Sequence, residues 1–182
     1  MAFTPGPNNI ILSNNSINHG FKNTIPLILA VFFGFLTVLS LALLGIGKIF
    51  LLYPSLTLIM KIISSIFLLF LSYKIFFSSS FSEDKKTKPL SFFQVYFFQI
   101  INPKVIFVTV SSASLFLQGK FNYEMEFFMI FSCFAFSTIT SGITWALIGH
   151  LFKRFADEKN KIIIFNRFMA VALAICIIMI IL

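Results

Sequence analysis

Asn8 and Asn9 follow directly after Pro5, Gly6 and Pro7, and their side-chain amides can both donate and accept hydrogen bonds. Proline lacks an N–H and glycine is conformationally free, so no regular helix passes through this tripeptide without leaving backbone carbonyls unpaired. An apolar run follows at once. Irregular backbone within a membrane is tolerated where protein buries it or where it lines a wet cavity. The stretch therefore indicates a polar site within the bilayer, the alternatives being a packed helix kink and a tail outside the membrane.

A second polar stretch, with Gln99, Asn102 and Lys104 around Pro103, lies inside the apolar run 91–117. If Lys104 marked the membrane boundary, residues 105–117 would span only roughly 20 Å, well short of the hydrocarbon. We therefore expect this stretch within the membrane, where a lysine costs about 2.5–3.5 kcal/mol unless it meets water or a partner. Lys104 is thus a candidate ligand for a carboxylate, the alternative being a lysine that snorkels to the interface.

The composition of the chain indicates an all-α integral membrane protein. Apolar residues make up 58% of the 182 residues and charged residues 11%, against about 45–50% and 25% in an ordinary globular domain. The net charge of +8 comes from basic residues in short connections, where they set topology. No nucleic-acid partner is expected; membrane lipid is, and a homo-oligomer is left open.

Apolar runs separated by polar connections predict six membrane spans. They are expected at residues 4–20, 25–46, 56–77, 91–117, 127–151 and 162–182. The connections after the first, third and fifth spans carry most of the lysines and arginines, and the opposite connections carry only Lys48 and Lys120. The positive-inside rule then places the odd-numbered connections in the cytoplasm and both termini outside.

The Asn/Pro breaks fall in the first and fourth spans, so the chain divides as three spans plus three. The expected domain is a single transmembrane unit over 1–182, with halves at about 1–77 and 90–182 joined by the cytoplasmic loop 78–89. Because each half has an odd number of spans, the second half must sit inverted relative to the first. Inverted repeats with discontinuous helices meeting near the midplane are typical of secondary transporters.

The two motifs also resemble those of a known family. Residues 4–9, Thr-Pro-Gly-Pro-Asn-Asn, and residues 99–104, Gln-Ile-Ile-Asn-Pro-Lys, are similar to the two signatures of the LysE/RhtB amino-acid exporters, at the matching separation. The resemblance extends over nearly the whole chain, including Lys61, Trp145 and Asn166-Arg167. In this chain the first span is shorter than is usual for that family, and alanine replaces the usual glycine near Ala170.

The resemblance implies a bacterial inner-membrane protein that exports amino acids or related small metabolites, driven by the proton gradient. We expect alternating access around Asn8, Asn9, Gln99, Asn102 and Lys104, with exposed backbone at the breaks meeting the charged ends of a zwitterion. All six acids lie in expected connections. Lys104, the substrate or a loop acid is therefore left as the proton carrier, and no cofactor or metal is expected.

Two alternatives belong to other classes. One is a shortened, non-transporting family member, because the first expected span barely reaches the minimum length. The other is a membrane thiol-electron carrier of the CcdA type, which needs paired cysteines beside the broken helices, whereas Cys133 and Cys176 stand alone in the fifth and sixth spans. An enzyme is not expected, since no embedded Ser/His/Asp or metal cluster is visible.

Overall fold

The computed structural model describes residue 3 and the ranges 6–45, 53–77, 90–117, 121–155 and 159–181. Within these residues the regular structure is entirely helical. The helices are α1 (Pro7–His19), α2 (Phe21–Leu43), α4 (Pro54–Phe76), α5 (Phe92–Ile101), α6 (Pro103–Phe116), α7 (Tyr123–Phe155) and α8 (Lys159–Ile181). The all-α fold predicted from composition is therefore confirmed for the described part of the chain.

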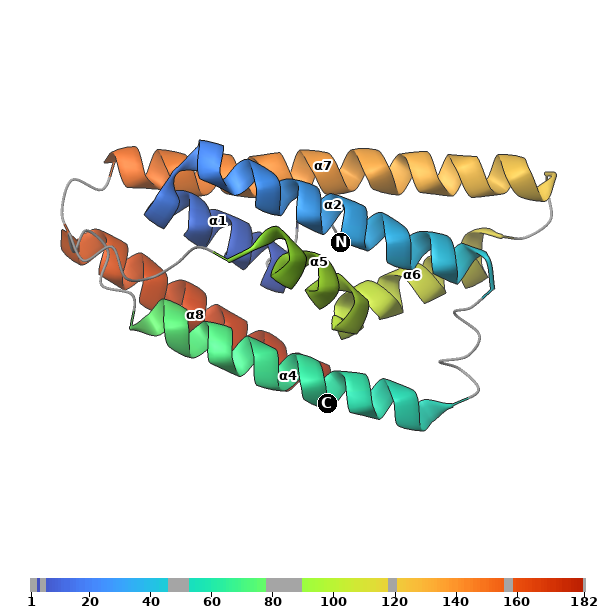
Figure 1. The fold of residues 1–182 in the computed structure, drawn as a ribbon, viewed down its shortest axis with the longest axis horizontal. Helices are drawn as coiled ribbons and strands as arrows, with labels where there is room; N and C mark the ends of the chain where they lie inside the picture. The colour runs from blue at the N-terminus through green and yellow to red at the C-terminus, as the bar shows by residue number, and fades with distance from the viewer. Residues whose placement is uncertain are drawn as a thin grey trace.

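The helices form a bundle whose members run roughly along its long axis (Figure 1). On one side α7 packs against α1 and α2, and on the other α4 packs chiefly against α8; α5 and α6 lie against α2. Both α1 and α6 begin near the middle of the bundle, and they run toward opposite ends of it. The short helices thus start where the long helices can enclose their first turns.

Two helices, α2 and the Tyr123–Phe152 part of α7, are long and apolar enough to cross a membrane. The pair α5 and α6 makes a third if the two count as one bent span. Shorter apolar stretches occur in α4, at Lys61–Tyr73, and in α8, at Ile163–Ile175. Six spans and a repeat of three plus three stay predictions, because length and composition support two or three crossings in the described residues.

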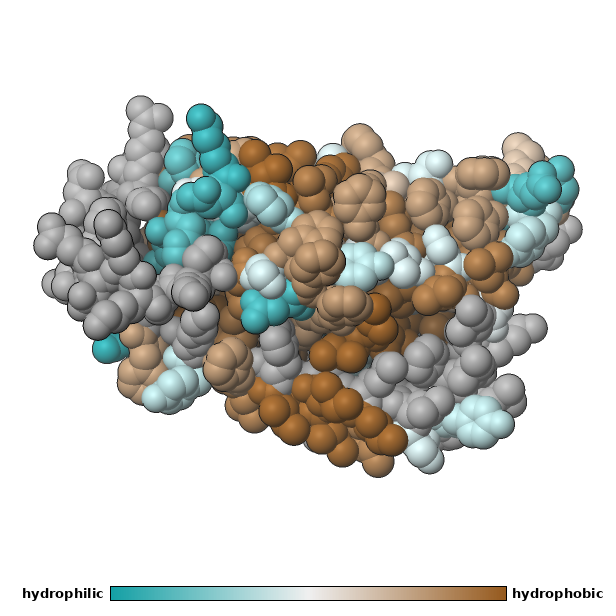
Figure 2. Space-filling view, in the orientation of Figure 1, coloured by the Kyte–Doolittle hydropathy of each residue, from teal (hydrophilic) through white to brown (hydrophobic). Residues whose placement is uncertain are grey.

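Hydrophilic side chains gather at the two ends of the visible face, and the surface between them is mainly apolar (Figure 2). Many large apolar side chains are exposed in the described part of the chain, among them Phe33, Phe93 and Phe136. Contiguous exposed apolar patches larger than a few hundred Å² are rare on soluble monomers. The surface therefore suits a helical protein surrounded by lipid.

Two helices begin earlier than predicted. Gly20 takes a φ of 86°, which favours glycine, and α2 begins right after it, so Pro26 lies inside the helix and not in its first turn. The Oδ1 of Asn122 accepts from the Met125 N–H at 3.1 Å and caps α7, as asparagine commonly does. Glu124 and Glu126 therefore lie in the first turn of α7, which corrects their placement in a connection.

Two apolar clusters fill the described bundle. The first cluster gathers residues of α1, α2, α4, α5, α7 and α8, including Leu12, Val31, Phe98 and Leu173. The second cluster lies among α2, α6 and α7 and includes Phe35, Leu39, Val105 and Ile130, with Phe134 packed against it. Val31 and Phe35 are one helical turn apart, so the two clusters meet along α2.

Gly149 lets α7 approach α1 closely. A methyl group added at this glycine would overlap the Ser13 carbonyl of α1. At Gly142, two turns away, the same addition would lie 3.2 Å from Cγ2 of Ile28. Small residues let helix backbones approach closely in membrane proteins, so α1 is held against α7 by backbone contact as well as by side chains.

Candidate functional site

A cavity of about 80 Å³ lies where α1 and α6 begin, enclosed by α2 and α7. Its lining residues are Gly6, Pro7, Asn8, Asn9, Val31, Phe35, Asn102, Lys104, Val105, Val108, Phe134, Thr138, Ser141 and Gly142. A cavity of this volume has room for several water molecules. Four of the five predicted binding residues line it; Gln99 does not, although it bonds to one of them.

The helix α1 begins at the cavity with Pro7 as its first residue and Gly6 before it. Proline suits this position, because its N–H would have no intrahelical partner there and its φ is already helical. The first hydrogen bond of the helix runs from the Ile10 N–H to the Gly6 carbonyl, at 3.0 Å. The predicted break at Pro7 is thus the start of a helix; Pro5 lies outside the described residues.

The break in the fourth apolar run lies at Asn102. α5 ends at Ile101, α6 begins at Pro103, and their axes differ in direction by 56°. Asn102 has an extended backbone, with φ −73° and ψ 109°, and its Oδ1 accepts from the Lys104 N–H at 3.1 Å. This residue is 1% exposed. Its amide therefore both caps α6 and forms part of the cavity wall.

Asn8 and Gln99 join the two breaks directly. The Nδ2 of Asn8 donates to Oε1 of Gln99 at 2.8 Å, and Nε2 of Gln99 donates to Oδ1 of Asn8 at 3.0 Å. Gln99, which is fully buried, also donates to the Val95 carbonyl at 3.0 Å. Buried amides need such partners, because an unsatisfied one costs about 1–3 kcal/mol. Gln99 thus holds α1 in place beside the cavity.

Gly34 of α2 leaves the space that the Gln99 side chain occupies. A methyl group added at Gly34 would lie 2.6 Å from Cγ of Gln99 and 2.9 Å from the Tyr96 carbonyl. One turn further on, the hydroxyls of Thr37 and Tyr96 share a hydrogen bond of 3.1 Å. Gly34 and Thr37 therefore form a face of α2 that packs closely against α5.

Lys104 lies in the first turn of α6 and is half-buried. Its stem and ammonium lie beside Gly6, where an added methyl group would be 2.7 Å from the ammonium nitrogen. The side chain of Lys104 therefore extends from the start of α6 to the start of α1. Asn9 contributes a further polar group: its Oδ1 accepts from the Ser141 hydroxyl of α7 at 3.5 Å.

The electrostatics of the cavity favour an anionic group. The N-terminus of a helix carries roughly half a positive charge, and the starts of both α1 and α6 line the cavity. Lys104 adds a full positive charge at the same place. The C-terminal end of α5, which carries the opposite partial charge, lies at the same break. A small molecule with one negative and one positive group would match this distribution.

Some polar residues near the site were not predicted to take part. On α1, Asn14 donates to Oδ1 of Asn166 on α8 at 2.9 Å, and Asn15 donates to the Thr24 hydroxyl of α2 at 3.0 Å. On α7, Ser141 is buried against Asn9 at the cavity. The contacts of Asn14 and Asn15 could have been expected from the run of consecutive polar residues on α1, because a helix that is polar on every side needs polar partners on every side.

The cysteines and the possible metal ligands bear on the alternative functions. Cys133 is exposed on α7, and the side chain of Cys176 lies outside the described set. Among the described residues, no group of three His, Cys, Asp or Glu side chains could hold a metal ion.

Ala170, in place of glycine, is buried, and its carbonyl accepts from the Ser72 hydroxyl at 2.9 Å. α8 therefore packs against α4 through this alanine.

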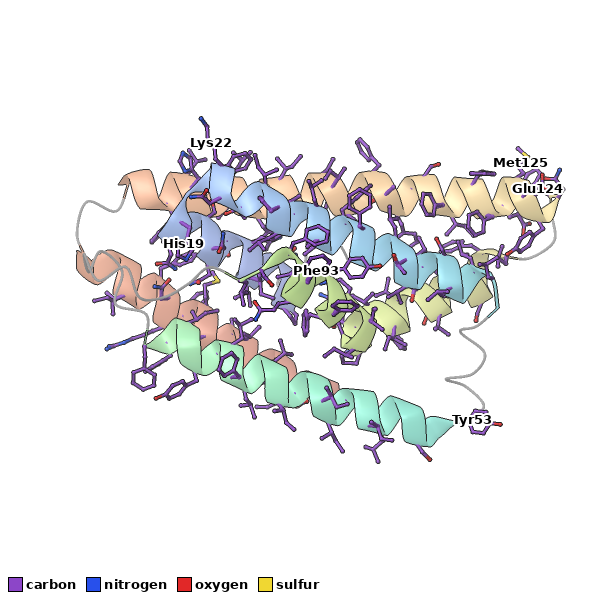
Figure 3. The ribbon with its side chains drawn as sticks, in the orientation of Figure 1. His19, Lys22, Tyr53, Phe93, Glu124 and Met125 are labelled. Atoms are coloured by element: carbon purple, nitrogen blue, oxygen red, sulfur yellow. The ribbon has the colours of Figure 1, made fainter. Side chains whose placement is uncertain are left out.

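The polar ends of the bundle lie away from the site. Figure 3 shows His19 and Lys22 at one end of the molecule and Glu124 and Met125 at the other. The starts of α1 and α6, which line the cavity, lie between these ends. The cavity is therefore positioned between the two ends of the bundle, as a site within a membrane would be.

The sequence matches the family described as LysE type translocator over residues 1–181. A cysteine/O-acetylserine efflux protein of Escherichia coli O1:K1 / APEC is 27% identical over 176 residues, which cover 96% of this chain and 89% of the relative. Proteins of the same description from Salmonella choleraesuis and Salmonella typhimurium are 29% identical over 154 residues, covering 84% of this chain and 78% of each relative. The comparison with solved structures gave no match.

Proposed function

This chain belongs to the LysE type translocator family, and on that premise we propose that it exports amino acids or related small metabolites across the bacterial inner membrane. The family and the efflux relatives support a transporter of amino acids, not an enzyme. The observation that carries the proposal is the meeting of two proline-led helix starts, α1 and α6, at one cavity with amide and lysine side chains in its wall.

In the proposed binding mode, the carboxylate of a zwitterionic substrate lies between the starts of α1 and α6. Lys104 supplies its positive charge, and the dipoles of both helices add to it. Asn8, Asn9 and Asn102 offer amide donors and acceptors to the polar head, and Gln99 positions Asn8 through their paired hydrogen bonds. The substrate ammonium lies toward the C-terminal end of α5, where the helix dipole is negative.

The proposed architecture is a 3+3 inverted repeat over residues 1–182, with halves at about 1–77 and 90–182. Its support is that α1 and α6 both begin at the cavity and run in opposite directions from it. Inverted repeats of this kind rock against each other around a fixed central site. We propose alternating access of that type within six spans, with membrane lipid around the bundle and homo-oligomerisation left open.

The proposed driving force is the proton gradient. Of the acids that the structure describes, Glu126 is buried, and its Oε1 accepts from the Phe121 N–H at 3.2 Å. It joins Lys104 and the substrate as a candidate proton carrier. Reconstituted vesicles with an imposed pH gradient would test the coupling: amino-acid movement should follow the sign of the gradient and stop when an ionophore dissipates it.

Metabolite profiling of the medium of expressing cells tests the function. An amino acid or related compound should accumulate outside with the parental chain and not with Asn102→Asp. That variant keeps an oxygen to cap α6 but places a negative charge beside the proposed carboxylate. Asn102→Ser, which keeps the cap without the charge, is the matched control and should retain part of the export. Equal accumulation with Asn102→Asp would contradict this site.

A further inference from the structure

The cavity has two kinds of wall. Its polar wall comes from the starts of α1 and α6, and its apolar wall includes Phe35 of α2 and Phe134 of α7. The two rings are in contact, with centroids 5.8 Å apart and planes inclined by 31°. Phe35 is buried within the second apolar cluster, and the half-buried Phe134 packs against that cluster. The aromatic pair thus lies between the cavity and the rest of the second apolar cluster.

We infer that Phe35 and Phe134 form the surface against which the side chain of the substrate lies, and that they restrict export to amino acids with short side chains. This inference rests on the proposed function. It follows from the distribution of polar groups: the head of a zwitterion occupies the polar wall, so the aromatic pair and the neighbouring valines remain for the side chain.

The volume of the cavity supports a limit on side-chain length. About 80 Å³ accommodates a small polar molecule in the present packing, and the second apolar cluster behind the rings leaves the aromatic wall backed by other side chains. Close-packed protein cores resist added methylenes. Discrimination in a hydrophobic pocket amounts to about 10–200-fold per methylene group, so one or two methylenes too many suffice to exclude a substrate.

Phe134 is the better residue of the pair to change, because it is half-buried whereas Phe35 is 9% exposed. Phe134→Ala removes one ring of the wall and lengthens the space available to a side chain. Phe136 on the same helix is 71% exposed and does not line the cavity. Phe136→Ala therefore makes the same chemical change on α7 away from the wall and serves as the matched control.

The test is export from vesicles that contain the full-length chain, measured with a short-chain set (alanine, serine and cysteine) and a long-chain set (leucine, methionine and phenylalanine). The parental chain should export the short-chain set at least about tenfold better, in line with one excess methylene. Phe134→Ala should raise the ratio of long-chain to short-chain export about tenfold or more. Phe136→Ala should leave the ratio at the parental value.

Phe35→Leu provides a second reading if Phe134→Ala does not fold or does not transport, because it shortens the same wall with a smaller loss of volume. A parental chain that exports both sets equally would overturn the inference. So would an unchanged ratio in Phe35→Leu, or in an active Phe134→Ala. A parental chain that exports neither set would overturn the proposed function itself, which is a different result from export without discrimination.

Discussion

Asn8 and Gln99, 91 positions apart, are paired by two hydrogen bonds in which each side-chain amide donates to the other. The pair fixes the start of α1 against α5, one turn before the break at Asn102. It therefore connects the two proposed repeat halves at the level of the cavity. A pair of hydrogen bonds at this place is suited to keep the starts of α1 and α6 at a fixed distance.

This pairing predicts a coupled loss of stability. Asn8→Leu should lower the free energy of unfolding by about 1–3 kcal/mol, because it leaves the buried amide of Gln99 without its partner on α1. Gln99→Leu should cost less, because the amide that it leaves, that of Asn8, is half-buried and lines the cavity. The double variant should lose less than the sum, by about 0.5–3 kcal/mol. Thermal unfolding of the purified proteins in detergent measures all three. Strictly additive losses would show that the two amides do not depend on each other.

Lys104→Met should abolish export while the protein still folds and inserts. Methionine preserves most of the unbranched apolar stem, and the change removes only the charge that the carboxylate needs. Lys104→Arg should retain part of the activity, since the larger guanidinium has little room beside Gly6. Export and membrane insertion are measured side by side. Parental export by Lys104→Met would identify the lysine as an interfacial anchor and reduce the proposed site to the amides.

Gly6→Ala should weaken substrate binding with little effect on stability. The added methyl group would meet the ammonium of Lys104, which is the far end of a flexible side chain and can move away. The measurement is the KM for export, which should rise as the charge leaves its position between the helix starts. If both KM and the melting temperature stay at their parental values, the position of the ammonium beside Gly6 is not part of binding.

Gly149→Ala should be much more damaging than Gly142→Ala on the same helix. At Gly149 the methyl group would overlap the backbone of Ser13, which cannot rotate away, and overpacking of this kind costs about 1–3 kcal/mol or more. At Gly142 it would meet a side-chain methyl of Ile28 at 3.2 Å, which can shift. Melting temperatures in detergent compare the two. Equal losses would indicate that α1 and α7 can separate freely.

Topology can be tested with reporters fused to the chain. A reporter that is active only in the periplasm should be active when fused after Lys120 and inactive when fused after Lys86, because basic connections are retained in the cytoplasm. A cytoplasmic reporter at the same two positions is the control and should give the opposite pattern. The reverse result at both positions would overturn the orientation derived from the basic residues.

The position of the break at Asn102 could be predicted from the sequence, because proline lacks the N–H that a continuous helix requires. The pairing of Asn8 with Gln99 could not, since it depends on how α1 and α5 are rotated about their axes. The role of Ser141 was missed for a similar reason: a serine on a helix looks the same in sequence whether it faces a glycine or an amide. Glu126 was misplaced because its helix begins before the apolar run does.

The contact of Gly149 with the Ser13 backbone has a mechanical consequence. Because the two backbones touch, α1 and α7 cannot slide past each other along their length without a clash at this position. On the other side of the bundle, the bond from Ser72 to Ala170 joins α4 to α8, and the bond from Asn14 to Asn166 joins α8 to α1. Removing the bond between Asn14 and Asn166 would therefore free α1 from α8 without changing any residue that lines the cavity.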